Sequence, residues 1–127
     1  MRTYGLRFDV NCSILFTELP LLQRAGAAKA AGFHGVEFWW PWAAMVPSDA
    51  EADAFVGSVT DAGVELVSRN FHAGDMAAGE RGIVSHPARV ADFRENVAAA
   101  AKIAGRTGCM RLNAPYGLRV PGVDIAE

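Results

Sequence analysis

The stretch HGVEFWWPWAAMVPSDAEADAFVGSVTDAGVELVSRN, residues 34–70, decides the fold of this chain. It opens with a short apolar run at 34–39 and closes with a second apolar run at 64–70, and both runs have the length of a buried strand. Between them lies a segment with apolar residues at helical spacing. A strand, a helix and a strand in this order predict a βαβ unit with parallel strands.

The sequence inside this stretch predicts both ends of the helix and the face that it buries. Ser48 and Glu51 stand three residues apart, which is the capping-box pattern of a helix N-terminus. Gly63 follows the helical segment, as expected where a helix ends. The face predicted to be buried consists of Phe55, Val56 and Val59.

The same unit repeats on both sides of this stretch. Upstream, an apolar run over Leu6–Leu15 predicts a first strand that ends near Asn11 or Cys12, and Thr17 is the predicted N-cap of the next helix. The face of that helix is predicted to carry Leu19, Leu22, Gly26 and Ala30, with Gly32 at its C-terminal end.

Downstream, Pro87 predicts the start of a third helix, Gly108 its end, and 109–114 a fourth strand. The helical stripe predicted there consists of Val90, Phe93, Val97, Ala100, Ala101 and Ala104. The predicted order is therefore βα, βα, βα, β.

Two architectures fit this order, a doubly wound sheet and a barrel. The first strand is not followed by the Gly-x-Gly-x-x-Gly pattern of a dinucleotide-binding sheet. Polar residues stand at the ends of all four predicted strands, where a barrel places its functional groups: Asn11, Glu37, Asn70 and Asn113. We therefore predict an α/β chain of the (β/α)₈ TIM-barrel type that supplies roughly the first four strands and three helices.

A barrel needs eight strands, so residues 1–127 are interpreted as the N-terminal half of one barrel domain. Four parallel strands leave two open edges and one uncovered face. On this expectation the chain is either truncated or assembles with itself or with another chain.

Composition narrows the class of partner. The formal net charge is −2 and the twelve Lys and Arg residues are scattered, so neither nucleic acid nor a membrane is expected as a partner. Cys12 and Cys109 lie in apolar segments without metal-ligand spacing and are expected to be reduced thiols. No leader or membrane-spanning segment is predicted, and the expected location is the cytoplasm.

The most informative segment is the long glycine-rich loop NFHAGDMAAGERGI at residues 70–83, because loops of this length after a strand usually have a function. Gly74 allows a sharp turn, while Asp75, Glu80 and Arg81 place charges of both signs beside it. One hypothesis is a loop that folds over a small anionic substrate, with Arg81 binding a carboxylate through two N–H groups. The alternative is a surface loop with a local Glu80–Arg81 pair.

This loop resembles the Asn-Leu-Pro-Ala-Gly-Asp-Trp-Ala-Ala-Gly-Glu-Arg-Gly-Ile signature of the hydroxypyruvate isomerase family, which includes the 2-oxo-tetronate isomerases. Residues 11–20 are similar to the family's Asn-x-Ser-x-Leu-Phe-x-Glu opening, residues 31–38 to its Gly-Phe-x-Gly-Val-Glu-Phe, and residues 92–97 to its third helix. The resemblance extends over residues 7 to about 117.

The resemblance implies a xylose-isomerase-like barrel that interconverts hydroxypyruvate and tartronate semialdehyde through an ene-diolate. The 2-oxo-tetronate isomerase reaction is the alternative within the family, so the substrate expected is a small 2-oxo or aldehyde acid. A catalytic glutamate and the ligands of a divalent metal (Mg or Mn) are expected from the family beyond residue 127, and no residue of this chain is assigned to catalysis or metal binding.

The substrate-binding residues predicted in this chain are Arg81, Glu80, Asp75, Gly74, His72, Asn70, Asn11, Glu37 and Asn113. Two positions of the loop depart from the family signature, since His72 stands in place of proline and Met76 in place of tryptophan. The tryptophans of the Phe38–Trp42 stretch are predicted either to form a wall of the pocket or to pack beneath the second helix or at a subunit interface.

Two other classes of function are alternatives to the isomerase. A non-catalytic half-barrel that pairs with itself or with a partner predicts a discrete dimer. Barrel endonucleases that act on abasic DNA share the fold class, but they rely on His-rich metal clusters and a basic surface. Three scattered histidines and a charge of −2 argue against that class.

Overall fold

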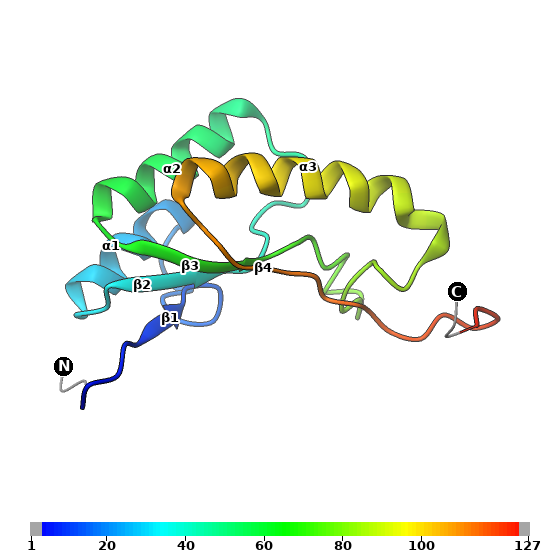
Figure 1. Ribbon diagram of the computed structural model, residues 1–127, viewed down its shortest axis with the longest axis horizontal. Coiled ribbons are helices and arrows are strands. Elements are labelled where there is room, and N and C mark those ends of the chain that lie inside the picture. The colour runs from blue at the N-terminus through cyan, green and yellow to red at the C-terminus, as the bar shows by residue number, and fades with distance from the viewer. Residues whose placement is uncertain (1–3, 125–127) are drawn as a thin grey trace.

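The structure is a computed structural model and describes residues 4–124. Strands and helices alternate along the chain (Figure 1). In order, they are β1 (Asp9–Asn11), α1 (Leu21–Ala30), β2 (Gly35–Phe38), α2 (Asp49–Ala62), β3 (Glu65–Asn70), a 3₁₀ turn η1 (Pro87–Arg89), α3 (Val90–Thr107) and β4 (Leu112–Asn113).

The four strands form one parallel sheet in the consecutive order β1-β2-β3-β4. The three α-helices all lie on one side of this sheet (Figure 1). A doubly wound sheet carries helices on both faces, whereas a barrel segment has consecutive strands and a single helical layer outside them. The arrangement therefore agrees with the barrel-type α/β fold predicted from the sequence.

The core lies between the sheet and the helices. Every second strand residue points to the helices, so Val10, Val36 and Leu66 are buried there. The capping box of α2 is present, since Glu51 N–H donates to Ser48 Oγ at 3.2 Å and the Glu51 carboxylate accepts from Ser48 N–H at 2.8 Å. The predicted buried face of α2 is confirmed at Phe55, Val56 and Val59.

The first helix differs from the prediction. It begins at Leu21 after Pro20, not at a Thr17 cap, and its buried residues are Ala25 and Ala28. Leu22, predicted to be buried, is 47% exposed. The predicted face is therefore rotated away from the core.

The cause is the Arg24 side chain, which binds the loop that precedes α1. Its guanidinium donates to the carbonyl oxygens of Leu19 at 2.9 Å, Cys12 at 3.1 Å and Thr17 at 3.4 Å. These carbonyls are satisfied by a side chain, so the loop does not need helical bonds of its own.

The third helix buries only part of the predicted stripe, at Ala100 and Ala104. Val90 and Val97, two members of the predicted stripe, are exposed, and the residues buried on α3 are Asn96, Ala100, Ile103 and Ala104. α3 packs against α2, and Asn96 and Ile103, which lie outside the predicted stripe, are buried on it. β1 spans only Asp9–Asn11 and β4 only Leu112–Asn113, so the first and fourth strands are shorter than predicted.

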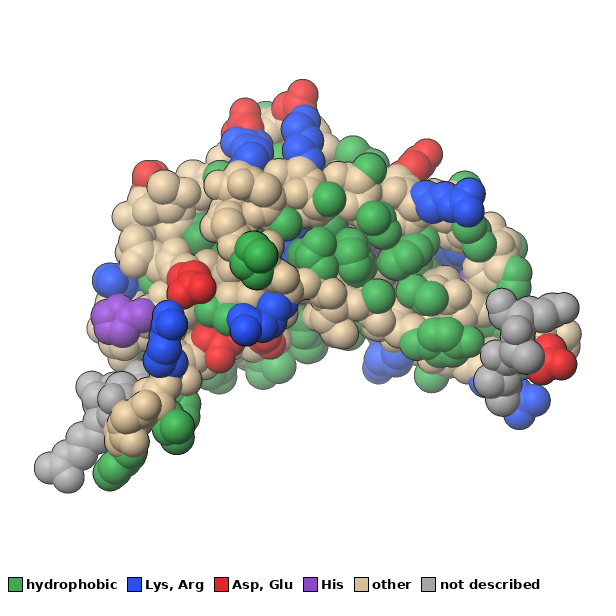
Figure 2. Space-filling view, in the orientation of Figure 1, with side chains coloured by type: hydrophobic (Ala, Val, Ile, Leu, Met, Phe, Trp, Pro, Cys, Tyr) green, Lys and Arg blue, Asp and Glu red, His purple; other side chains and the backbone are tan. Residues whose placement is uncertain are grey.

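The face of the sheet opposite the helices is open within the described part of the chain. Gly35 faces this side, because a Cβ added there would lie 3.1 Å from the Cβ of Asp9 and 2.8 Å from a methyl of Val67. Both outer strands, β1 and β4, have one unpaired edge in residues 4–124. Figure 2 shows hydrophobic side chains gathered below α3 and around the C-terminal segment, and Met110 and Tyr116 are among the exposed apolar residues. None of the described helices is long and apolar enough to cross a bilayer.

Candidate functional site

The carboxyl ends of the strands bring together four polar side chains, here called the strand-end cluster: Asn11, Glu37, Asn70 and Asn113. Asn11 Nδ2 donates to Glu37 Oε1 at 2.6 Å, and Asn113 Nδ2 donates to Asn70 Oδ1 at 3.0 Å. The cluster therefore consists of two hydrogen-bonded pairs, one across β1 and β2 and one across β3 and β4. The sequence predicted the location of these residues but not this pairing.

Ser13, which the sequence analysis did not single out, connects the cluster to the tryptophan segment. Its backbone N–H donates to Asn11 Oδ1 at 2.9 Å, and its Oγ accepts from the backbone N–H of Trp39 at 2.9 Å. Both ends of the Asn11 amide are thus occupied, one by Glu37 and one by Ser13. Asn11 accordingly holds Glu37 in place and has little capacity left for a substrate.

The glycine-rich loop is organised around Glu80. The carboxylate of Glu80 accepts from the backbone N–H of Asp75 and from Arg89 Nη1 at 3.0 and 3.3 Å. Arg89 also donates from Nε to Asp92 at 3.2 Å. The Asp75 N–H bond, followed by the Arg89 charge, holds the pKa of Glu80 below its ordinary value, so this side chain is a carboxylate at neutral pH.

Gly74 is required by the position of Glu80. Its φ is +82°, and a Cβ there would lie within 2.9 Å of three atoms of the Glu80 side chain. The loop closes where Gly82 meets the segment after β4, because a Cβ on Gly82 would overlap the carbonyl group of Pro115. Gly82 forms an antiparallel bridge with Tyr116 at this point. These two glycines let the loop fold back on itself and dock against the chain beyond β4.

Arg81 does not form the local pair with Glu80 that the alternative interpretation predicted. The partner of the Glu80 carboxylate is Arg89, which the sequence analysis missed. Arg81 is exposed, and its Nη1 donates to the carbonyl oxygens of Met76 at 3.0 Å and Glu80 at 2.7 Å. The only sequence signal for Arg89 was its place in the turn before the third helix.

His72 is buried and fastens the loop to the segment after β2. Its Nε2 lies 2.9 Å from the Ala43 carbonyl oxygen, and its Nδ1 accepts from the Gly74 N–H at 2.9 Å. Because a carbonyl can only accept, Nε2 carries the proton and the ring is the neutral Nε2–H tautomer. Both ring nitrogens contact backbone groups, so His72 positions the loop.

Asn96 of α3 completes the same connection. Its Oδ1 accepts from the His72 backbone N–H at 2.8 Å, and its Nδ2 donates to the Met45 carbonyl at 2.8 Å. The residue is fully buried. A polar residue within an otherwise apolar helix face was the signal that sequence reasoning could have used to find it.

The tryptophan segment packs around a buried cation. The guanidinium carbon of Arg69 lies 4.6 Å from the ring centre of Trp40, 5.4 Å from that of Trp42 and 5.3 Å from that of Phe55. Arg69 is 1% exposed, and its three guanidinium nitrogens have no hydrogen-bond partner among residues 4–124. Burial lowers the pKa of Arg69 to about 10, which still leaves the guanidinium charged at neutral pH. Cation–π contacts therefore hold these rings in place.

A cavity of about 500 Å³ lies between the tryptophan segment and the glycine-rich loop. We call it the tryptophan pocket. Four of the predicted site residues line it, namely His72, Gly74, Asp75 and Glu80, whereas the strand-end cluster and Arg81 do not. Its other lining residues are Trp39, Trp40, Trp42, Ala43, Met45, Ala73, Met76 and Arg89. The predicted site thus divides into a strand-end group and a loop group.

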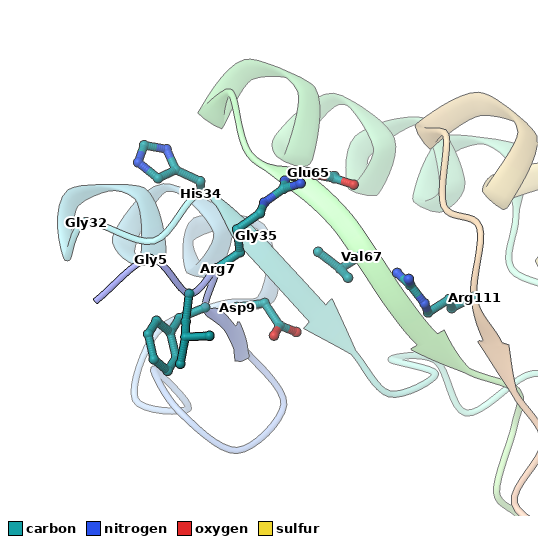
Figure 3. Close-up of a pocket in the computed structure, with 11 residues that line it drawn as sticks. Gly5, Arg7, Asp9, Gly32, His34, Gly35, Glu65, Val67 and Arg111 are labelled. Atoms are coloured by element: carbon teal, nitrogen blue, oxygen red, sulfur yellow. Dashed lines mark hydrogen bonds and ion pairs between the residues drawn. The ribbon is translucent and has the colours of Figure 1, made fainter. Parts of the chain in front are cut away.

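A second hollow of about 550 Å³ opens at the amino ends of the strands (Figure 3). Arg7 reaches across it to Glu65 at the start of β3, with a 3.0 Å ion pair between two exposed side chains. His34 also lines it. In a barrel this end of the strands serves stability, so the hollow is not a candidate active site.

The described residues do not fit a metal ion on their own. No group of three His, Cys, Asp or Glu side chains lies close enough within residues 4–124 to hold one. The strand-end cluster offers a single carboxylate, Glu37, and one of its oxygens already accepts from Asn11.

Comparison with known proteins places these features in a family. Residues 25–127 match the family model of the xylose isomerase-like TIM barrel. The chain is 52% identical over 95% of its length to a Streptomyces coelicolor protein provisionally named a hydroxypyruvate isomerase, and 38% identical over 96% to the hydroxypyruvate isomerase of Escherichia coli. It covers 44% and 45% of these two proteins, so it spans less than half of their length.

A solved structure shows the same fold. The chain superimposes with a TM-score of 0.76 and 37% identity on a crystal structure from Brucella melitensis described as an AP endonuclease of family 2. The match covers 93% of this chain and 43% of that one.

Proposed function

The chain belongs to the xylose isomerase-like TIM barrel family, and from this premise we propose that it forms the substrate-binding half of an isomerase barrel. The proposed substrate is a small 2-oxo or aldehyde acid, and the proposed reaction interconverts hydroxypyruvate and tartronate semialdehyde. Support comes from relatives named hydroxypyruvate isomerase and, at 37% identity, from a Cupriavidus necator relative named 2-oxo-tetronate isomerase. Isomerisation of a 2-oxo-tetronate is the alternative reaction.

The observation that carries this proposal is the strand-end cluster. Glu37 and three amides meet at the edge of the sheet where barrel enzymes bind their substrates. These groups suit a hydroxylated acid, because the Asn70 and Asn113 amides can donate to its oxygens and the second Glu37 oxygen can accept from a hydroxyl group. The exposed Arg81 is the proposed partner of the substrate carboxylate.

The proposed reaction moves a proton between neighbouring carbons. A base removes a proton from C3 of hydroxypyruvate, the C–H electron pair forms the C2–C3 double bond, and the C2 oxygen takes up the negative charge. A proton then adds at C2, and the O3 proton passes to the C2 oxygen, which leaves an aldehyde at C3 and a hydroxyl group at C2. We propose that the base is a glutamate of the barrel's other half, while Asn70 and Asn113 donate to the developing oxyanion and Glu37 orients the hydroxyl group.

The test replaces the matching half of the Escherichia coli hydroxypyruvate isomerase with this chain, and the product is here called the fused protein. We expect it to isomerise hydroxypyruvate. In the fused protein, Glu37→Gln should lower kcat/KM about tenfold to a hundredfold, because it removes one charge-assisted hydrogen bond. Glu18→Gln, at an exposed carboxylate outside the cluster, is the matched control. A folded fused protein without activity, or with equal effects of both substitutions, would contradict the proposal.

The crystal structure from Brucella melitensis is described by a different activity, cleavage of DNA at abasic sites. This reading is tested by titrating the chain with abasic duplex DNA at low salt, where contacts between basic residues and phosphates are strongest. We expect no saturable binding. Binding that weakens steeply as salt is added would favour the endonuclease reading over the isomerase.

A further inference from the structure

The tryptophan pocket adjoins the strand-end cluster. Its lining begins one residue after β2, at Trp39, and two residues after β3, at His72. Ser13 also joins the two sites, because it bonds both to Asn11 of the cluster and to the backbone of Trp39. A molecule held by the strand-end cluster therefore has the pocket beside it, on the side of the second and third strands.

The walls of the pocket suit a polyhydroxy chain. All three tryptophans of the protein line it together with two methionines, and these surfaces can pack against C–H groups. The carboxylates of Asp75 and Glu80 stand on the opposite loop and can accept from hydroxyl groups. A cationic ligand is disfavoured, because the Arg69 guanidinium already lies against Trp40 and Trp42.

The pocket is preformed by contacts within the chain. The Arg69 cation–π contacts hold the tryptophans, and the Asn96 and His72 bonds join the two loops. The Glu80–Arg89 pair holds the far wall. A site whose walls are held without the ligand loses little free energy to ordering when the ligand binds.

The pocket is larger than a three-carbon substrate requires. A cavity of about 500 Å³ falls within the range of about 300–1,000 Å³ that drug-sized ligands occupy, and a three-carbon acid is far smaller. Met76 lines this space, so a larger side chain at position 76 would reduce its volume.

From these observations we propose that the tryptophan pocket binds the hydroxylated tail of an acid longer than three carbons, and that Met76 sets the chain length accepted. This inference rests on the proposed function, because it assumes that the reacting end of the substrate lies at the strand-end cluster. It makes the pocket the determinant of substrate class within the family.

The first test measures binding alone, by calorimetry on the 127-residue chain. The probes are glycerate, erythronate and arabinonate, which are non-reactive acids of three, four and five carbons. We expect arabinonate to bind at least about tenfold more tightly than glycerate and to quench the intrinsic tryptophan fluorescence. Met76→Trp should abolish this preference, whereas the matched control Met110→Trp, at an exposed site outside the pocket, should preserve it. Equal affinity for all three acids would overturn the inference.

The second test separates this inference from the proposed function. In the fused protein, kcat/KM should rise with the carbon number of the 2-oxo acid, and Met76→Trp should lower it about tenfold for the longest acid with little effect on hydroxypyruvate. An inactive fused protein with graded acid binding would refute the proposed function and leave the pocket assignment standing. An active one whose kcat/KM is independent of chain length would refute the pocket assignment alone.

Discussion

At the scale of single residues, Arg69 and Asn96 occupy buried positions where strand and helix patterns favour apolar side chains. Asn96 satisfies two backbone groups of two different loops, and Arg69 is surrounded by aromatic rings. Both contacts join segments far apart in the sequence. Periodicity describes only which face of an element is buried, so it could not reveal them.

Asn96→Ala should lower the free energy of unfolding by about 2–3 kcal/mol, because it leaves the His72 N–H and the Met45 carbonyl without their partner. Urea denaturation followed by circular dichroism measures this change. Gln23→Ala, at an exposed amide on α1, is the control and should shift stability by no more than about 0.5 kcal/mol. Equal effects of the two substitutions would show that the Asn96 bonds contribute nothing.

Gly74→Ala and Gly79→Ala separate steric overlap from backbone strain. Both glycines have positive φ, +82° and +98°, but only Gly74 has side-chain atoms where a Cβ would lie. Gly79→Ala should cost about 1–2 kcal/mol through strain alone. Gly74→Ala should cost more and should also displace Glu80 from the Asp75 N–H, visible in the amide NMR signal of Asp75. A smaller loss for Gly74→Ala would contradict the described packing.

At the scale of elements, the glycine-rich loop is a folded unit rather than a flexible connection. One carboxylate, Glu80, holds the turn at Asp75 and the start of α3 through Arg89. The sequence indicated this loop and its charged residues as a candidate site. It did not predict the partner of Glu80, because Arg89 lies outside the motif and approaches only when the loop folds back.

The order of this loop should depend on pH. The pKa of Glu80 is depressed below its ordinary value of 4.5, so the carboxylate stabilises the folded loop above that pH and the contribution is lost as pH falls through the depressed pKa. Amide hydrogen exchange at Asp75 should therefore accelerate below about pH 4.5 relative to the rest of the chain. Glu80→Gln should remove this pH dependence. An unchanged profile in that variant would assign the transition to another group.

The helices show where local sequence information is sufficient. The cap and buried face of α2 were predicted correctly, because the capping box and its apolar residues act within one helix. The start and face of α1 were predicted wrongly, because the Arg24 side chain satisfies carbonyls of the preceding loop. The stripe of α3 was predicted correctly at Ala100 and Ala104 and wrongly at Val90 and Val97, which are exposed.

At the scale of the whole molecule, alternation of strands and helices was enough to predict the parallel sheet and the position of the strand-end cluster. Parallel strands necessarily bring their carboxyl ends to one edge, so residues at those ends meet whatever the details of packing. The tryptophan pocket could not be predicted, because its shape depends on two loops held together by Asn96, His72 and Arg69.

The architecture of the whole molecule also explains why the chain alone is not the proposed catalyst. Its sheet has two unpaired edges and an open face within residues 4–124, and it spans less than half of its named relatives. A closed barrel removes both edges and encloses the strand-end cluster. We therefore expect the 127-residue chain alone to be inactive and the fused protein to be active.

The measurement that tests the central claim most directly is NMR of the fused protein with hydroxypyruvate in D₂O. Proton transfer through an ene-diolate should yield tartronate semialdehyde with deuterium at C2, and recovered hydroxypyruvate with deuterium at C3. Product and recovered substrate that stay free of deuterium over many turnovers would favour a direct hydride shift over the ene-diolate. No product at all, from a folded protein whose Escherichia coli parent is active under the same conditions, would contradict the claim that this chain is half of such an isomerase.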